Sequence, residues 1–436
     1  MCRYRLRPTP AQQAELLKHC GHARFVWNLA VEQHAHWRPG RASAPGFAEQ
    51  CRQLTQARAE WPWLREGSVT VQQQALKDFT QAMANYFKGT HRRPNWRKAG
   101  RHEGFRIVAL KPEAIRRLSR HTGELRVPKV GWVRFRWSRP IPPSVRSYRV
   151  TRDRAGRWHV AFAHVPDAIP APRNGENVGV DRGVTVSAAL STGQLLHAPG
   201  LKGREAERLL RLQRTLARAA PGSHRRAKVK ATTARLKARE ADRRKDWVEK
   251  TSTALARGFD VIAVEDLDMR GMVRSARGTV DAPGRNVAQK SGLNRAVLAA
   301  GWGALVRRLE DKAPGRILRV DPRYTSQTCN ACGHRASENR ESQAVFRCTG
   351  CGYRANADVN AAMNIRDTAA GHAVAARGAL QPVGGAVNRE PQPDLLSTWE
   401  RLESPRQGRG EDVNWAGRSR RSSAARRARH PARCRS

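Results

Sequence analysis

Three acidic residues, each beside a run of apolar residues, are the first candidates for chemistry. Asp181 ends the apolar run VGV, Glu265 ends VIAV, and Asp358 opens the helically spaced segment ADVNAAMNI. Carboxylates gathered at one place repel one another unless a metal ion lies between them, and Mg²⁺ prefers oxygen ligands. Two such ions about 3.5–4 Å apart can activate water and hold a leaving oxygen. The three residues therefore predict Mg²⁺-dependent hydrolysis of a phosphodiester.

Two of these carboxylates also fit an ordinary structural role, and the third has acidic neighbours that could take its place. Asp181 could be a turn or cap residue after a strand, and Asp358 a favourable charge in the first turn of a helix. Asp266 and Asp268 follow Glu265 closely. Successive residues of a strand face opposite sides, so Glu265 and Asp266 cannot both point to one site. The residues alone leave that choice open.

Four of the eight cysteines form two Cys-x-x-Cys pairs, Cys329 with Cys332 and Cys348 with Cys351. Each pair lets a tight turn aim two thiolates at one point, and two pairs complete a tetrahedron around Zn²⁺. A glycine follows each pair, where such a turn needs a positive φ. Four sulfur ligands leave no open position, which predicts a structural zinc site. Four buried free thiols, or a redox pair, are the alternatives.

The charge balance points to a polyanionic partner. The 436 residues include 82 Lys and Arg against 37 Asp and Glu, a formal net charge of +45. A surface this positive repels itself unless a polyanion accompanies it, so we expect a nucleic acid. An arginine-rich codon bias would not explain the low number of acids. The apolar fraction of 39% supports a folded core and excludes wholesale disorder.

No stretch is long and apolar enough for a transmembrane helix, and the N-terminal residues lack an apolar signal core. We therefore expect a cytoplasmic, nucleoid-associated bacterial protein without a membrane partner. The four scattered cysteines fit incidental thiols in a reducing compartment.

The apolar periodicity predicts which elements position these residues. Helical spacing over 11–88, followed by a basic loop at 89–98, predicts a helical unit at 11–98. Alternation over 104–165 predicts an antiparallel β-barrel or sandwich built from 1–10 plus 99–175. Residues 176–370 mix strands and helices, with the strand, strand and helix order of acids that is typical of ribonuclease H-like nucleases. The predicted fold is thus an α+β multidomain protein: a barrel with an inserted helical bundle, then a ribonuclease H-like domain with a zinc-ribbon insert at 325–355. Residues 371–436 show no period and are expected to be disordered.

The predicted elements within 176–370 have definite limits. Strands are expected at 178–181, 184–190, 195–197, 261–264 and 317–320, and helices at 203–219, 224–257, 293–312 and from about 357. In the helical unit, a third helix over 69–87 should turn Val71, Ala75, Phe79, Ala82, Met83 and Tyr86 inward.

Three basic or polar groups are candidate contacts to nucleic acid. A basic loop contributes Arg92, Arg93, Trp96, Arg97 and Lys98. The ring of Trp96 could stack on a base. The third helix offers Gln73, Gln74 and Lys77 for base edges. The two long basic helices carry Arg204, Arg208, Arg211, Arg225, Arg226, Lys228, Lys230, Arg243 and Arg244. The alternatives are Trp96 as a core anchor and the helices as plain solvated faces.

Several stretches together resemble TnpB-type proteins of bacterial insertion sequences, the OrfB-like transposase family related to type V CRISPR effectors. They are GVDRG, VIAVEDLDM, GLNRAVLAAGWGAL and the block from RYTSQTCNACG to ADVNAAMNI. The resemblance implies an RNA-guided DNA endonuclease with a guide RNA, a double-stranded DNA target and a single RuvC-like site. It implies that the catalytic acids are Asp181, Glu265 and Asp358, and so favours Glu265 over Asp266. The cysteine insert would bind the target nucleic acid.

Two other functions fit the same scaffold. A transposase would join DNA ends, and a catalytically inactive regulator would bind nucleic acid without cutting it. The presence of all three acids argues against the inactive regulator. The sequence leaves the oligomeric state open.

Overall fold

The structure is a computed structural model that describes residues 2–36, 44–143 and 145–378. Residues 379–436, most of the tail expected to be disordered, lie outside the described residues. The prediction is wrong for 371–378, which continue the last helix, α10 (Ala357–Gly378). Within the described part of the chain, every helix is too short or too polar to cross a membrane.

Four helices form the first helical unit. They are α1 (Pro10–Ala35), α2 (Phe47–Glu60), α3 (Pro62–Glu66) and α4 (Val69–Phe87). Thr9 begins α1 through a capping box with Gln12, which satisfies backbone groups that a helix end leaves unpaired. On α4 the predicted inward residues Val71, Ala75, Phe79 and Met83 are buried and Ala82 is half-buried. Tyr86 is exposed, contrary to the prediction, because it lies in the last turn.

Seven strands follow the predicted alternation but make two antiparallel sheets. One has the order β1-β7-β6-β2, with β1 (Cys2–Arg5), β7 (Trp158–Phe162), β6 (Ser147–Arg152) and β2 (Gly104–Val108). The other has the order β3-β4-β5, with β3 (Ile115–Arg117) after a short turn η1 (Pro112–Ala114), β4 (Thr122–Val127) and β5 (Gly131–Arg136). A lone bridge joins Leu6 to Phe135. Among the described residues the strands form two sheets around one core, which agrees with the sandwich that the alternation also allowed, and a closed single barrel is not seen.

A separate five-stranded sheet contains both parallel and antiparallel strands and has the order β10-β9-β8-β11-β12. Its parallel strands are β8 (Asn177–Asp181), β11 (Val261–Glu265) and β12 (Ile317–Val320). The antiparallel strands are β9 (Ala188–Leu190) and β10 (Leu195–Leu196), so the strand predicted over 184–190 is shorter than expected. The hairpin after β8 and the parallel neighbours β11 and β12 agree with the ribonuclease H-like expectation.

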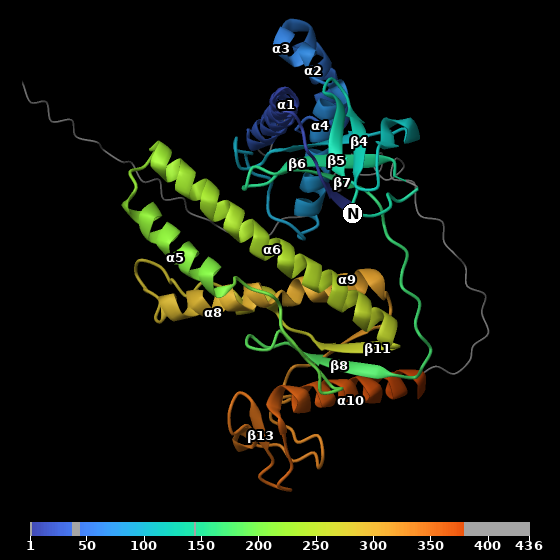
Figure 1. Cartoon of the computed structure of the whole chain (residues 1–436), viewed down its shortest axis with the longest axis vertical. Helices are drawn as coiled ribbons and strands as arrows, with labels where there is room; N and C mark the ends of the chain where they lie inside the picture. Colours follow the sequence, from blue (N-terminus) through green and yellow to red (C-terminus); the bar gives the residue numbers. More distant parts are fainter. Residues whose placement is uncertain (1, 37–43, 144, 379–436) are drawn as a thin grey trace, which may run out of the picture. The chain divides into compact units, whose positions relative to one another are not determined.

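Helices cover both faces of this sheet (Figure 1). The remaining helices are α5 (Gly203–Arg218), α6 (His224–Gly258), α7 (Met269–Met272), α8 (Val287–Ala300) and α9 (Trp302–Lys312). Leu255 of α6 and Leu305 of α9 pack with Ile262 on one face, whereas Ile365 of α10 packs with Ala263 on the other. Neighbouring strand residues thus bury opposite sides, as expected for a sheet between two helical layers.

Two glycines explain how these helices fit. The helix predicted over 293–312 is divided between α8 and α9 at Gly301, which has φ 78°, a conformation that favours glycine. A Cβ built on Gly179 would lie 1.9 Å from the carbonyl oxygen of Ala362, so only glycine lets α10 approach β8 this closely.

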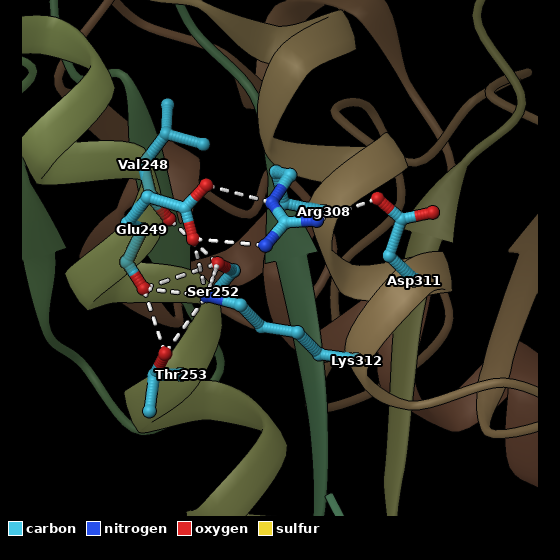
Figure 2. A network of polar contacts seen from close by, with 7 residues as sticks. All are labelled: Val248, Glu249, Ser252, Thr253, Arg308, Asp311 and Lys312. Atoms are coloured by element: carbon cyan, nitrogen blue, oxygen red, sulfur yellow. Dashed lines mark hydrogen bonds and ion pairs between the residues drawn. The ribbon is translucent and has the colours of Figure 1, made fainter. Parts of the chain in front are cut away.

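Polar contacts fix α6 against α9 (Figure 2). The Glu249 carboxylate accepts hydrogen bonds from Arg308 at 2.8 Å and 3.0 Å. Lys312 donates to the hydroxyls of Ser252 and Thr253, both at 2.8 Å. These contacts hold the helix that begins with Trp302 beside the end of β8.

Candidate active site and cysteine module

Parallel pairing brings Asp181 and Glu265 to the same edge of the sheet. Val180 of β8 lies opposite Val264 of β11, and each strand ends at its next residue, an acid. The carboxyl ends of parallel strands meet at one edge, which is where α/β sheets commonly bind ligands. The two carboxyl groups are close enough for Glu265 to raise the pKa of Asp181.

Asp358 reaches the same place from the first turn of α10. The Asn356 side chain begins this helix by accepting hydrogen bonds from the backbone N–H groups of Asp358 and Val359, at 3.0 Å and 3.1 Å. A Cβ built on Gly183, two residues beyond Asp181, would lie 3.9 Å from Oδ2 of Asp358. The structure therefore brings together all three acids that the sequence singled out.

The acids load this edge with negative charge. Burial, then the charges of Glu265 and Asp358, raise the pKa of Asp181 to about 7. Burial also raises the pKa of Glu265, while a hydrogen bond from Thr325 and the nearby Arg182 oppose the rise. Arg182 and Arg340 balance part of this charge, and hard oxygen donors whose like charge is only partly balanced fit a divalent cation of the Mg²⁺ type.

The residues after Glu265 have different surroundings, as strand alternation predicts. Glu265 is only 8% exposed, whereas Asp266 is exposed and forms an ion pair with Arg319 at 2.7 Å. Asp268 accepts hydrogen bonds from the backbone at the start of α7. Glu265 is thus the member of this acidic run that faces Asp181.

Three further residues at the site were missed from the sequence. Arg340 donates to Oδ1 of Asp358 at 3.2 Å, and the Thr325 hydroxyl donates to Oε1 of Glu265 at 3.0 Å. Trp302 donates its indole N–H to the carbonyl oxygen of Gly183 at 3.1 Å, which fixes the loop after Asp181. All three lie in stretches that carry the family resemblance. Their sequence positions, however, do not reveal which acid or loop each one contacts.

The four predicted cysteines form one cluster. Their Sγ atoms all lie within 4.8 Å of one another, with Cys329 3.8 Å from Cys351 and Cys332 3.6 Å from Cys348. Among the described residues, no other group of three or more His, Cys, Asp or Glu is this compact. The predicted turns are confirmed, since the glycines at 333 and 352 have φ of 76° and 75°. We call residues 325–355 the cysteine module; it includes η2 (Ser337–Asn339) and β13 (Val345–Arg347), which pairs with β14 (Arg354–Asn356).

The local backbone favours a thiolate at Cys348. Burial works against it, but the backbone N–H groups of Cys351 and Gly350 and the neighbouring thiols lower the pKa of Cys348 to about 6. Thiolates are the form that binds metal, so the donors fit Zn²⁺.

The basic loop is only partly free for a ligand. Trp96 is 54% exposed, so its interpretation as a core anchor is wrong. Arg97 lies over the Trp27 ring at 3.5 Å, where burial lowers its pKa to about 10. Arg93 donates to the carbonyl oxygen of His34 at 2.7 Å. Arg92 and Lys98 are exposed.

On the helices, several candidates are engaged within the chain. Gln74 accepts a hydrogen bond from Arg106 at 2.7 Å, and Arg226 donates to backbone carbonyls at the end of α5. Arg243 pairs with Glu205, and Arg244 pairs with Glu240 at 3.0 Å. Gln73 is half-buried. The exposed candidates are Lys77, Arg204, Arg208, Arg211, Arg225, Lys228 and Lys230.

Three family models match successive parts of the chain. Residues 1–40 match a helix-turn-helix domain of OrfB/IS605 proteins, and residues 159–276 match the OrfB/IS605 family, described as a probable transposase. Residues 302–365, which include the cysteine module, match a Cas12f1-like TNB domain.

Two relatives match over most of their length. InsQ of Escherichia coli (strain K12), designated a candidate RNA-guided DNA endonuclease, is 36% identical over 403 residues, covering 91% of this chain and 98% of that protein. A Streptomyces pristinaespiralis protein with the same designation is 32% identical over 340 residues, covering 76% and 80%. A solved Cas12f1–sgRNA–target DNA complex aligns with TM-score 0.49 and 14% identity over 82% of each chain. By its two sequence relatives, the chain belongs to the OrfB/IS605 (TnpB) family.

Proposed function

We propose that this chain is an RNA-guided DNA endonuclease that hydrolyses phosphodiester bonds at the edge formed by the ends of β8 and β11. The observation that carries the proposal is the meeting of Asp181, Glu265 and Asp358, with the pKa of Asp181 raised to about 7 by burial and by the other two acids. A buried cluster of like charges lowers the stability of the fold unless a cation neutralises it. Such clusters are therefore typical of functional sites. The designation of both full-length relatives supports the same activity.

The three acids would hold two Mg²⁺ ions. The chemistry that such a pair of ions would supply is activation of water and stabilisation of the leaving 3′ oxygen. Asp181 must lose its proton to take part, while Thr325 holds Oε1 of Glu265 and leaves Oε2 available. Arg340 contacts Asp358 from the cysteine module and carries a positive charge that would meet the scissile phosphate. The chain thus supplies a negative pocket for cations beside a positive group for the substrate.

We assign a structural Zn²⁺ to Cys329, Cys332, Cys348 and Cys351. Four sulfur donors within 4.8 Å of one another leave no open coordination position. The ion would stabilise the module that carries Thr325 and Arg340. Its role would therefore be structural and not catalytic.

The partners proposed are a guide RNA and a double-stranded DNA target. A guide–target heteroduplex of about 20 base pairs is held through its backbone in a positive channel, which suits a chain with net charge +45. We assign residues 176–370 to cutting, the strands of 1–10 plus 99–175 and the helices of 11–98 to reading the target, and 325–355 to contacting it. The exposed cations of the basic loop and of α5 and α6 would contact phosphate.

The test is to sequence RNA that co-purifies with the protein, then to challenge the complex with a plasmid library. We expect cuts at sites matching the guide, dependent on Mg²⁺, and none with Asp181→Ala although that variant retains RNA. Joined DNA ends would instead support a transposase. RNA binding without any cutting by the unmodified protein would support an inactive regulator.

A further inference from the structure

A buried hydrogen bond links the start of the cysteine module to one of the three acids. Thr325 is 7% exposed and Glu265 is 8% exposed. The Thr325 hydroxyl donates to Oε1 of Glu265 at 3.0 Å, with the carbonyl oxygen of Pro322 as a second acceptor at 3.1 Å. A hydroxyl has one proton, and hydrogen bonds to an ionised acceptor are the stronger ones. The bond to the Glu265 carboxylate therefore prevails when that group is charged.

The position of Thr325 is set by α10. Asn364 donates to the backbone carbonyl oxygens of Thr325 and Thr328, at 2.8 Å and 2.7 Å. Asn360 is fully buried, donates to the same Thr328 oxygen at 2.8 Å, and accepts the backbone N–H of Asn330 at 3.0 Å. Two asparagines one turn apart on the helix thus hold the loop that enters the module.

The loop needs such support because its backbone is strained. Tyr324, directly before Thr325, has φ 64°, in the left-handed region that a bulky residue rarely adopts. Strained conformations persist where the surroundings over-determine them, and they cluster at functional sites. Here the surroundings are the side-chain amides of α10.

The same helix also carries Asp358 in its first turn. One rigid element therefore acts on two acids: it carries Asp358, and through Asn364 and Thr325 it orients the carboxylate of Glu265, which β11 places at the site. A carboxylate whose Oε1 is held presents Oε2 in a fixed direction, whereas a free carboxylate must be ordered when a cation binds.

We propose that Thr325 is a positioning residue for divalent-cation binding at Glu265, and that Asn364 fixes Thr325 in place. The inference rests on the proposed function in so far as Glu265 is a metal ligand. Loss of a hydrogen bond to a metal-ligating group costs about 10- to 100-fold in metal affinity, and we expect the lower end for Thr325.

The test measures the affinity of the full chain for Mn²⁺ in the absence of nucleic acid, with electron paramagnetic resonance as the readout of bound and free Mn²⁺. Thr325→Val keeps the shape and removes the hydroxyl, and should weaken Mn²⁺ binding about 10-fold. Thr325→Ser keeps the hydroxyl and should restore the affinity of the unmodified chain. Thr80→Val is the matched control, because the Thr80 hydroxyl donates within α4 at 3.1 Å. Thermal unfolding of each variant separates loss of fold from loss of the hydrogen bond.

Equal Mn²⁺ affinity in Thr325→Val and the unmodified chain would overturn the inference, as would failure of a folded Thr325→Ser variant to restore binding. Asp181→Asn shows which bound Mn²⁺ belongs to the three acids. If the unmodified chain has no Mn²⁺ site sensitive to Asp181→Asn, the proposed metal site itself fails, and the inference falls with it. Weak binding by Asn364→Ala would support the role of α10.

Discussion

Asp181 is the acid on which the electrostatic cost of the site falls most heavily. It lies next to Glu265 across the parallel pair, and Asp358 approaches from α10. Without a cation, the folded chain favours the protonated form, and burial is the largest cause. The same arrangement that suits metal binding therefore destabilises the metal-free protein near neutral pH.

We predict opposite effects of Asp181→Asn on stability and on cleavage. The pKa of Asp181 is raised to about 7 in the folded chain, whereas an unfolded chain loses this proton near pH 3.9. Between these values the folded state binds more protons, so metal-free stability falls as pH rises from about 4 to 7. At pH 7, Asp181→Asn should gain about 1 kcal/mol or more in unfolding free energy, and the gain should shrink at pH 5. Cleavage should be lost.

Urea unfolding at the two pH values, without added Mg²⁺ or Mn²⁺ and without a chelator that would remove the proposed zinc, measures this effect. Asp266→Asn is the control, because Asp266 is exposed and paired with Arg319. It should leave both cleavage and the pH dependence unchanged. An Asp181→Asn variant that is less stable than the unmodified chain at pH 7 would contradict the electrostatic argument.

At the scale of elements, local periodicity predicted what depends on local sequence. The limits of α4, α5 and α6, and the acids at the ends of β8 and β11, were accessible because apolar spacing shows where a helix or strand ends. The choice between a closed barrel and two packed sheets was not accessible, because pairing between distant strand edges leaves no local pattern. The contacts of Arg340 and Thr325 depend on the position of the cysteine module, which α10 fixes through Asn360 and Asn364. The spacing of residues along the sequence does not reveal this position.

The close contact between β8 and α10 makes Gly179→Ala a sensitive change. The new Cβ would lie 1.9 Å from the carbonyl oxygen of Ala362 and would push the helix that carries Asp358 away from the sheet. Overpacking of this kind costs about 1–3 kcal/mol, and cleavage should fall with it. Urea unfolding provides the measurement. Gly303→Ala is the matched control, since nothing lies within 4 Å of its Cβ position in α9 and alanine favours helix.

Removal of zinc should unfold the cysteine module while α6 and α9 stay folded. Four thiolates within 4.8 Å repel one another without a cation, and structural Zn²⁺ contributes about 10–16 kcal/mol in small modules at pH 7. We expect one tightly held zinc per chain by elemental analysis. After chelation, the exchange rate of the backbone amides should rise across residues 325–355. It should stay unchanged in α6 and α9, which the Glu249–Arg308 contact joins. A purified chain that holds no zinc would contradict the assignment.

For the whole molecule, the net charge of +45 includes cations of two kinds. Some are already engaged, as in the pairs Arg243–Glu205 and Lys250–Asp246. Others, including Lys228 and Lys230 on α6, are exposed and make no ion pair among the described residues. Only the second kind can meet phosphate without breaking an existing contact. This division separates the cations that are available to the proposed nucleic-acid partner from those already engaged in ion pairs within the chain.

The salt dependence of RNA binding tests that division. Each phosphate contact contributes about 0.7–0.9 to the slope of log K against log salt. Replacing Lys228 and Lys230 by Gln should therefore lower this slope by about 1–2 and leave thermal stability unchanged. Arg226→Gln should instead lower thermal stability, because Arg226 donates to the carbonyl oxygens at the end of α5. Lys250→Gln is the matched control on the same helix, since Asp246 already holds that ammonium group at 2.8 Å. An equal loss of slope from Lys250→Gln would mean that the RNA senses total charge and not the exposed cations.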